Sequence, residues 1–143
     1  MNSNAGQICG IFISEQREIG VIALNEAEII EDWGLHGDRK ARAGSPRQVL
    51  LVDEATLHSV DLQPGALNEN VTIRGLDINN LRSGQHLRIG SALVEITGPC
   101  TVCGELEHIR SGLKERLRGR RGMLARVLRS GTAKIGDSVW IEQ

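Results

Sequence analysis

QHLRIGSALVEIT, residues 85–97, contains two short apolar segments separated by Gly90-Ser91. The segments at 85–89 and 92–97 predict two strands in a tight hairpin, because a glycine readily adopts the backbone that a two-residue turn needs. Outward from this hairpin, further short strands are predicted at residues 7–14, 27–32, 47–52, 70–74, 122–127 and 138–141. The glycine inside 7–14 predicts a bend in that strand.

Two segments have helical character. Residues 53–60 begin with acidic residues and carry apolar side chains at Leu57 and Val60, which predicts a short helix capped by Asp53. Residues 105–118 have helical composition, interrupted at Ser111-Gly112. Many short strands with few helices favour a closed or nearly closed barrel. We therefore predict a mainly β fold, a single barrel-like domain over residues 1–143 with a few short helices.

Composition narrows the function classes. Lys and Arg total 17 and Asp and Glu total 18, so a net charge of −1 suggests no global electrostatic role. Aromatic residues are only 2%, which disfavours nucleic acid as a partner. No apolar run approaches the ~20 residues of a membrane span, so no membrane partner is expected. The N-terminus lacks signal-peptide features, and three cysteines are an odd count, so we expect a reducing, cytoplasmic location.

Positive charge is concentrated near the C-terminus. Between Lys114 and Lys134, Glu115 is the only acid among the arginines 116, 118, 120, 121, 126 and 129. One interpretation is a solvated surface. The other is an anion site, in which residues 119–122 bring the guanidinium groups of Arg120 and Arg121 together with flexible backbone amides.

The sequence Cys100-Thr-Val-Cys103 leaves several interpretations open. A structural zinc site needs four ligands, and the histidines show no paired spacing, so no structural zinc is expected. A thioredoxin-like dithiol normally belongs to a βαβ layout, which is absent here. A regulatory disulfide, two inert thiols and one reactive sulfur remain. The third is favoured at Cys103, because the helical segment that follows would stabilise a thiolate there.

Two loops carry further polar candidates. In residues 34–39, Asp38 and Arg39 either form a surface ion pair or bind a ligand. In residues 64–70, Glu69 and Asn70 either bond the backbone at a turn and strand end or bond a substrate.

Four motifs occur in order: GLHGDRKA…RQVLLVDEATL, PGALNENVTIRGLDINNLRSGQHLRIG, VEITGPCTVCGELE and RGMLARVLRSGTAKIGDSV. Together, over residues 35–139, they closely resemble the MOSC domain family, which includes the C-terminal domain of molybdenum-cofactor sulfurases and small stand-alone bacterial proteins. The resemblance implies a β-rich, barrel-like fold with one reactive cysteine after a strand.

The resemblance also assigns roles to individual residues. Cys103 falls on the reactive position, where Val102 replaces the family's usual Pro and Cys100 replaces a residue that is often basic. The family's frequent GDRH is GDRK at 37–40, and its REN is NEN at 68–70. The matched positions are therefore Cys103 as the catalytic residue, with Asp38, Arg39, Glu69 and Asn70 as accessory residues. Cys100 is an accessory thiol that could resolve a disulfide.

Three function classes follow from the resemblance. In the first, the protein binds a molybdenum cofactor, with Cys103 as the metal ligand and Arg120, Arg121 and Arg126 near the pterin phosphate, and it reduces N-hydroxylated compounds as small-molecule substrates. In the second, Cys103 carries sulfur as a persulfide between a donor and an acceptor protein. In the third, the protein is a binding module with regulatory or silent thiols. Whether it is an enzyme stays open. Pyridoxal phosphate binding is associated with the family as a whole, and no desulfurase domain is expected in 143 residues.

Overall fold

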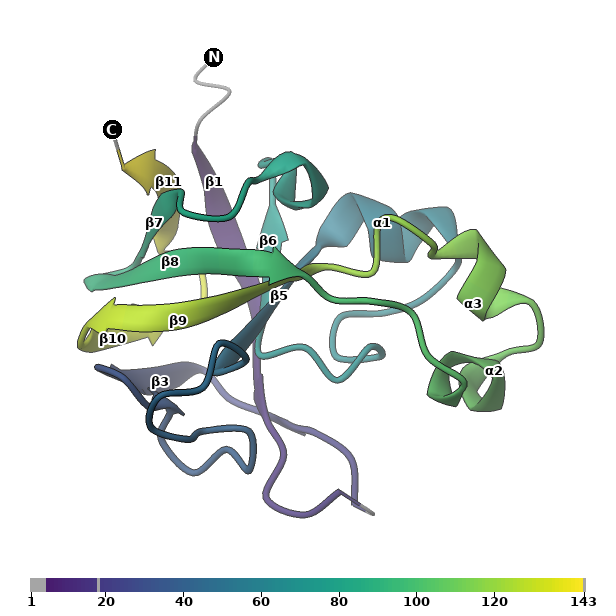
Figure 1. The fold of residues 1–143 in the computed structure, drawn as a ribbon, viewed down its shortest axis with the longest axis horizontal. Helices are drawn as coiled ribbons and strands as arrows, with labels where there is room; N and C mark the ends of the chain where they lie inside the picture. The colour runs from purple at the N-terminus through teal and green to yellow at the C-terminus, as the bar shows by residue number, and fades with distance from the viewer. Residues whose placement is uncertain (1–4, 18, 143) are drawn as a thin grey trace.

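Strands rich in β-branched and aliphatic residues close into a seven-stranded barrel (Figure 1). The structure is a computed structural model that describes residues 5–17 and 19–142. The barrel strands are β1 (Ala5–Ile13), β5 (Val49–Asp53), β6 (Val71–Arg74), β7 (His86–Ile89), β8 (Ala92–Pro99), β9 (Met123–Arg129) and β11 (Ser138–Glu142). Their order is β11-β7-β8-β9-β5-β6-β1, and β1 pairs with β11 to complete the ring.

Strand pairing in the barrel is antiparallel except between β5 and β6, which run parallel with Leu51 opposite Val71. Helix α1 (Glu54–Ser59) lies in the connection between these two strands. The bend predicted inside the first strand is confirmed, because the β1–β6 register shifts between Ile8 and Gly10. The hairpin predicted at Gly90-Ser91 is confirmed by the pairing of Ile89 with Ala92.

A second sheet covers one side of the barrel. It consists of β10 (Gly131–Lys134), β3 (Glu26–Ile30) and β4 (Gly34–Leu35), while the two-residue strand β2 (Ile22–Ala23) pairs with β1. Ile29, Leu35 and Ala133 from this sheet are fully buried and join the barrel core. Strands β2, β4 and β10 were not predicted from the sequence.

The helices gather on the other side of the barrel (Figure 1). α2 (Glu105–Ile109) and α3 (Leu113–Arg116) are separated at Gly112, which adopts φ 88°, and a 3₁₀ turn covers Ile78–Asn80. The predicted cap of α1 is confirmed, since the Asp53 carboxylate accepts a hydrogen bond from Ala55 N at 3.0 Å. Within residues 5–17 and 19–142, no helix is long and apolar enough to cross a membrane.

Strand β5 explains how barrel and helices are joined. Val49 and Leu51 point into the barrel core, whereas Leu50 and Val52 pack in a second apolar cluster beneath the helices. Both faces of the strand are buried, which accounts for its continuous apolar sequence. The second cluster also contains Leu57, Leu67, Cys100, Leu106, Leu113, Leu117 and Leu124. The segments that form the candidate functional site lie at this junction of the two cores.

Candidate functional site

Three segments that are distant in the sequence enclose a cavity of about 500 Å³ beside the second apolar cluster. Residues 39–47 form one wall, residues 100–105 form another, and Arg121 closes the third side. The lining residues are Arg39, Lys40, Ala41, Arg42, Ser45, Arg47, Leu50, Leu67, Asn68, Cys100, Thr101, Cys103, Glu105, Arg121 and Leu124. We call this space the basic cavity.

The two thiols on the cavity wall differ in environment. Cys100 N donates to Gly122 O at 2.8 Å, so residue 100 continues the β8 edge beyond Pro99. From there the side chains alternate as in an extended chain: Cys100 and Val102 pack on the second apolar cluster, whereas Thr101 and Cys103 are exposed. Neither cysteine is in a disulfide. The exposed sulfur at the mouth of the cavity is therefore that of Cys103.

The predicted helix after Cys103 is present but short. Gly104 is the N-terminal flanking residue of α2, and Cys103 O accepts a hydrogen bond from Leu106 N at 3.2 Å. α2 has only five residues, so its macrodipole is small. Exposure beside the basic cavity, more than the helix, distinguishes Cys103 from Cys100.

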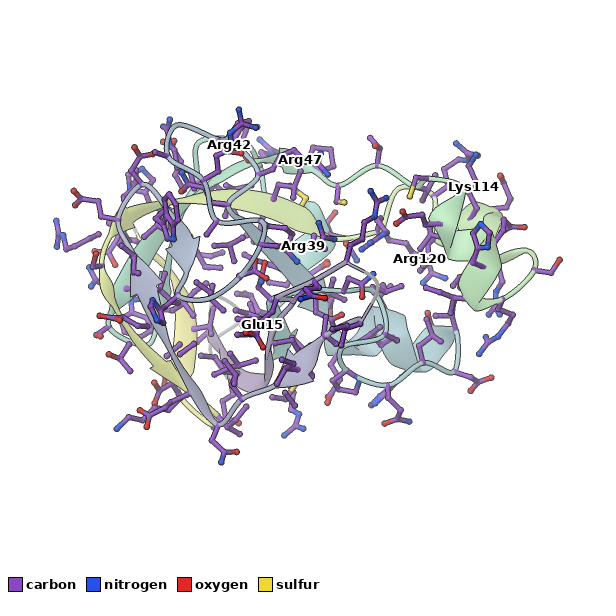
Figure 2. All side chains as sticks on the ribbon, turned by 90° about the horizontal axis from the view of Figure 1, so that it is seen from below. Glu15, Arg39, Arg42, Arg47, Lys114 and Arg120 are labelled. Carbon is purple, nitrogen blue, oxygen red and sulfur yellow. The ribbon has the colours of Figure 1, made fainter. Side chains whose placement is uncertain are left out.

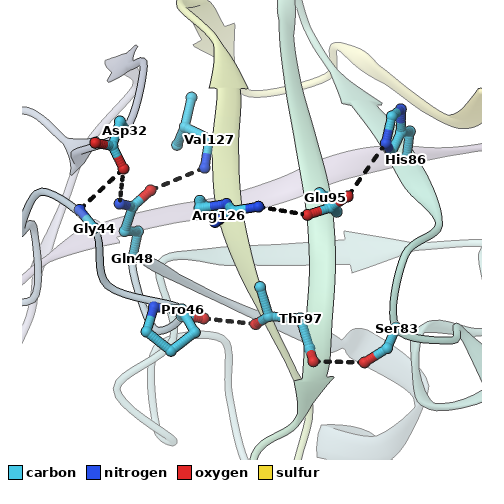
Figure 3. Close-up of polar contacts among 10 residues, drawn as sticks. All are labelled: Asp32, Gly44, Pro46, Gln48, Ser83, His86, Glu95, Thr97, Arg126 and Val127. Atoms are coloured by element: carbon cyan, nitrogen blue, oxygen red, sulfur yellow. Dashed lines mark hydrogen bonds and ion pairs between the residues drawn. The ribbon is translucent and has the colours of Figure 1, made fainter.

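A fully buried glutamine fixes the wall formed by residues 39–48 (Figure 3). The side-chain amide of Gln48 donates to Asp32 Oδ1 and to Arg42 O, both at 3.0 Å, and its oxygen accepts from Val127 N on β9 at 2.9 Å. Thr97 Oγ1 on β8 donates to Pro46 O at 2.5 Å. These bonds tie the loop to the barrel, so its cations keep a defined position.

Cations dominate the basic cavity. Arg39, Arg42 and Arg47 project from the same loop, and Figure 2 shows Arg42 and Arg47 near the upper edge of the view with Arg39 closer to its centre. Among the described lining residues, Glu105 is the only carboxylate, and it forms an ion pair with Arg17. That pair is the main reason why the pKa of Glu105 lies below its ordinary value. Like charges held together in this way favour an anionic ligand.

Arg121 is the cation with the most unused hydrogen-bonding capacity. Its Nη2 donates to Leu67 O at 2.9 Å, while Nε and Nη1 are buried with no acceptor among the described residues. The next residue must be glycine, because Gly122 has φ 121° and a Cβ there would lie 2.6 Å from Leu51 O. This close approach to β5 sets the guanidinium at the cavity wall. A buried donor without an acceptor is unfavourable, and an anion would satisfy it.

Lys40 is partly buried at the base of the same wall. Its Nζ donates to Asn68 O at 2.7 Å. Burial lowers the pKa of Lys40, the neighbouring guanidinium groups of Arg39 and Arg121 lower it further, and the carboxylates of Asp38 and Glu69 act in the opposite direction. An anion in the cavity would favour the protonated amine.

Asp38 and Arg39 both bond Ser14, the residue that follows β1. Ser14 N donates to Asp38 Oδ1 at 2.8 Å, and Arg39 Nε donates to Ser14 Oγ at 3.3 Å. Asp38 is buried, and its Oδ2 has no hydrogen-bond partner among the described residues. Asp38 thus holds the start of the loop, while Arg39 reaches the basic cavity and a neighbouring hollow lined by Ser14, Arg17, Asn68, Glu105 and His108.

Glu69 and Asn70 are not among the residues that line the cavity, and their side chains bond buried groups of the protein. Glu69 is fully buried and accepts from Gly65 N, Leu67 N and the Thr72 hydroxyl at 2.8, 3.1 and 2.6 Å. Asn70 is also fully buried, accepting from Leu50 N at 2.9 Å and donating to Phe12 O at 3.2 Å. Their positions fit the turn and strand-end bonding that the sequence left open.

The three arginines predicted to bind a phosphate are not together. Arg121 lines the basic cavity, whereas Arg120 lines a different hollow near α1 and donates to Ser59 Oγ at 3.0 Å. Arg126 lies on β9 between buried Ala125 and Val127, so strand alternation points it outward to Glu95, 2.9 Å away (Figure 3). The sequence prediction did not include Lys40, Arg42 or Arg47. The cluster of basic residues at 39–47 was the available signal.

The described residues contain no group of three or more His, Cys, Asp or Glu side chains arranged to hold a metal ion. A metal at this site would therefore need ligands beyond these side chains, such as those of a cofactor, and the exposed Cys103 thiolate is the candidate protein ligand.

The MOSC domain model matches residues 38–140. The chain belongs to the MOSC domain family. This family is associated with molybdenum-cofactor binding or sulfurase-like function.

Among solved structures, the YuaD protein of Bacillus subtilis is 20% identical with a TM-score of 0.79, and the match covers 96% of this chain and 95% of YuaD. YiiM from Escherichia coli is 18% identical with a TM-score of 0.71, covering 96% and 70% of the two chains.

YiiM from Geobacillus stearothermophilus has a TM-score of 0.68 at 17% identity, with 96% of this chain and 73% of that chain covered. At these identities the similarity establishes the fold, a β-barrel of MOSC type, as the sequence predicted. No curated protein sequence matches the chain.

Proposed function

We propose that the protein binds a phosphorylated cofactor of the molybdenum-pterin class in the basic cavity, with the Cys103 thiolate as the protein ligand of the metal. The observation that carries this proposal is the presence of the exposed Cys103 sulfur on the wall of the same 500 Å³ cavity as five cationic side chains. Family membership supplies the cofactor class.

The residues present fit such a group. Arg121 offers two buried donors that lack acceptors, and Arg39, Arg42 and Arg47 surround them with positive charge. Guanidinium groups bind phosphate through paired, charge-assisted hydrogen bonds. Leu50, Leu67 and Leu124 provide an apolar floor that would contact a flat ring. When bound, the cofactor would supply two-electron redox chemistry, and reduction of an N-hydroxylated compound is the candidate reaction.

The test is the metal content of protein produced in a host that makes the cofactor. The wild type is expected to carry close to one molybdenum per chain, and Cys103→Ser is expected to lose it while keeping its melting temperature. Cys100→Ser serves as the matched control and is expected to retain the metal. Absence of molybdenum from the wild type would reject the proposal. A mass increase of one sulfur on Cys103 in that same sample would instead support the persulfide carrier, which its exposure equally permits.

A further inference from the structure

Lys40 is the lysine of this chain that faces a concentration of positive charge. The chain has three lysines, at positions 40, 114 and 134. Lys40 lines the basic cavity, and its Nζ donates a hydrogen bond to Asn68 O. The Lys114 and Lys134 side chains lie away from the cavity, on α3 and β10. Figure 2 shows Lys114 beside the helices, apart from Arg39, Arg42 and Arg47.

The charged groups around Lys40 come from three segments. Arg39 and the buried Asp38 are its neighbours on its own loop, Glu69 approaches from the segment before β6, and Arg121 approaches from the segment before β9. Glu69 already accepts three hydrogen bonds from other groups, and Asp38 bonds Ser14 N. No ion pair joins either carboxylate to Lys40 among the described residues. The amine is therefore held by one backbone carbonyl and lies near two guanidinium groups and two carboxylates, of which Asp38 has the largest effect on its pKa.

We propose that Lys40 is a modification site that reacts with small acyl phosphates, which the basic cavity binds through their phosphate group. The inference rests on the anion-binding part of the proposed function and not on the metal. Arg121 and the loop arginines would hold the phosphate, and the acyl carbon would then lie near the Lys40 nitrogen.

The reaction needs no other reactant. The neutral Lys40 nitrogen attacks the acyl carbon, a C–N bond forms, and the C–O bond to phosphate breaks. The proton lost by nitrogen leaves with the phosphate, so an acyl phosphate and an amine give an amide and hydrogen phosphate, with no oxidation or reduction. Burial lowers the pKa of Lys40 and so increases the neutral fraction of its amine relative to an exposed lysine, whereas the bound phosphate and the carboxylates of Asp38 and Glu69 act in the opposite direction. A bound donor also raises the local concentration of the acyl group.

The consequence is a change in the cavity's affinity for anions. An acylated lysine has no positive charge, so the modified cavity would keep its arginines but lose one cation next to Arg121. Acylation of Lys40 would therefore weaken binding of the phosphorylated cofactor, linking occupancy of the site to the supply of acyl phosphates.

The experiment incubates the full-length protein with acetyl phosphate and follows each lysine by peptide mass spectrometry. Lys134 and Lys114 are controls within the same molecule. Lys40 is expected to acetylate at least about tenfold faster than Lys134, the effect of a bound donor. Inorganic phosphate is expected to slow Lys40 and leave Lys134 unchanged. An uncharged active ester is expected to show a much smaller preference for Lys40. Equal rates at Lys40 and Lys134, or a preference that phosphate does not reduce, would overturn the inference.

Variants separate this inference from the metal proposal. Arg121→Gln is expected to remove most of the preference for Lys40 with acetyl phosphate, whereas the adjacent Arg120→Gln is expected to keep it. Cys103→Ser should leave Lys40 acetylation unchanged even though it abolishes metal loading. If Arg121→Gln proves unstable, Arg47→Gln provides the same test at the opposite wall. Rapid acetylation of Lys40 in protein that never binds molybdenum would support this inference while rejecting the proposed function.

Discussion

Arg120 and Arg121 are adjacent in the chain, yet their guanidinium groups line two different hollows of the protein. Arg120 bonds Ser59 Oγ and Arg116 O beside α1 and α3, while Arg121 bonds Leu67 O at the basic cavity. Gly122, immediately after them, has φ 121°, a backbone conformation that glycine adopts without strain and other residues do not. The pair consequently offers a matched comparison for anion binding.

Arg121→Gln is expected to weaken the binding of inorganic pyrophosphate about tenfold or more, because a hydrogen bond between charged groups contributes about 1.5–3 kcal/mol. Arg120→Gln is expected to bind pyrophosphate as the wild type does. Titration calorimetry measures both, with melting temperatures as the check on folding. Equal losses in the two variants would mean that the anion binds elsewhere.

The two thiols of the Cys100–Cys103 segment are expected to react unequally with an alkylating probe at neutral pH. Cys103 is exposed and should be labelled first, whereas Cys100 is 9% exposed in the second apolar cluster and should react only as the protein opens. Mass spectrometry of the peptide that contains both residues gives the ratio. Matched labelling, or a disulfide formed between them under mild oxidation, would indicate a symmetric dithiol instead.

Cys9 is expected to stay unlabelled in the same experiment. Burial, with a further contribution from the Glu54 carboxylate, raises the pKa of Cys9 to about 12, so this group remains a thiol at neutral pH. Denatured protein is the control, in which all three cysteines should react alike. Rapid labelling of native Cys9 would contradict this expectation.

Asn70→Ala is expected to destabilise the protein by about 2 kcal/mol or more, because it leaves the buried Leu50 N and Phe12 O without their partner. Urea denaturation measures the loss. Gln63→Ala, an exposed change in the same connection, is the control and should be close to neutral. If Asn70→Ala keeps full stability but loses ligand binding, Asn70 acts on the ligand and not on the fold.

Glu107 is expected to make the α2–α3 region sensitive to acid. Its carboxylate accepts from Gly112 N at 3.0 Å and Lys114 N at 2.9 Å, and these bonds lower its pKa from 4.5. Because the folded-state pKa is the lower one, the stabilisation is present above pH 4.5 and is lost as the pH falls through the lowered value. Amide exchange at Gly112 and Lys114, measured at pH values of about 6, 4.5 and 3, should show the loss of protection at these two amides.

Glu107→Gln is expected to increase exchange at Gly112 already at neutral pH. Glu115→Gln is the control, since that exposed carboxylate forms an ion pair with Arg118, three residues further along the chain. Unchanged protection of Gly112 in the Glu107 variant would show that the carboxylate does not join the two helices.

Local sequence signals predicted the strands and caps well, because each depends on a few neighbouring residues. The Gly90-Ser91 turn, the Asp53 cap and the helix break at Gly112 are such cases. Strand β10 was missed because Gly131–Lys134 contains two polar residues and Ala133 is its one fully buried side chain. Its partner β3 is about a hundred residues earlier in the sequence, so no local pattern indicates the pairing.

The candidate site was predictable where family motifs pass through it and at Arg121, which the charge pattern at 119–122 indicated and which lines the basic cavity. Cys103 and Arg39 were placed by resemblance, and both line the basic cavity. Arg42 and Arg47 reach it because Gln48 fixes their loop through bonds to Asp32 and Val127, which are tertiary contacts. The cluster at 116–129 suggested joint action of Arg120, Arg121 and Arg126. In the structure, Arg120 and Arg121 line two different hollows, and strand alternation points Arg126 outward to Glu95.

Pairing of β1 with β11 has a consequence for biosynthesis. Ala5 and Gly6 lie opposite Trp140 and Val139, so the first described strand of the chain finds one neighbour only when the last described strand has been made. Strand β7 also lacks one of its neighbours until β11 has been made, because Ile89 pairs with Val139. Until β11 leaves the ribosome, two strand edges stay unpaired and can recruit strands of other nascent chains. The chain is therefore more open to aggregation before β11 has been made than after the barrel has closed.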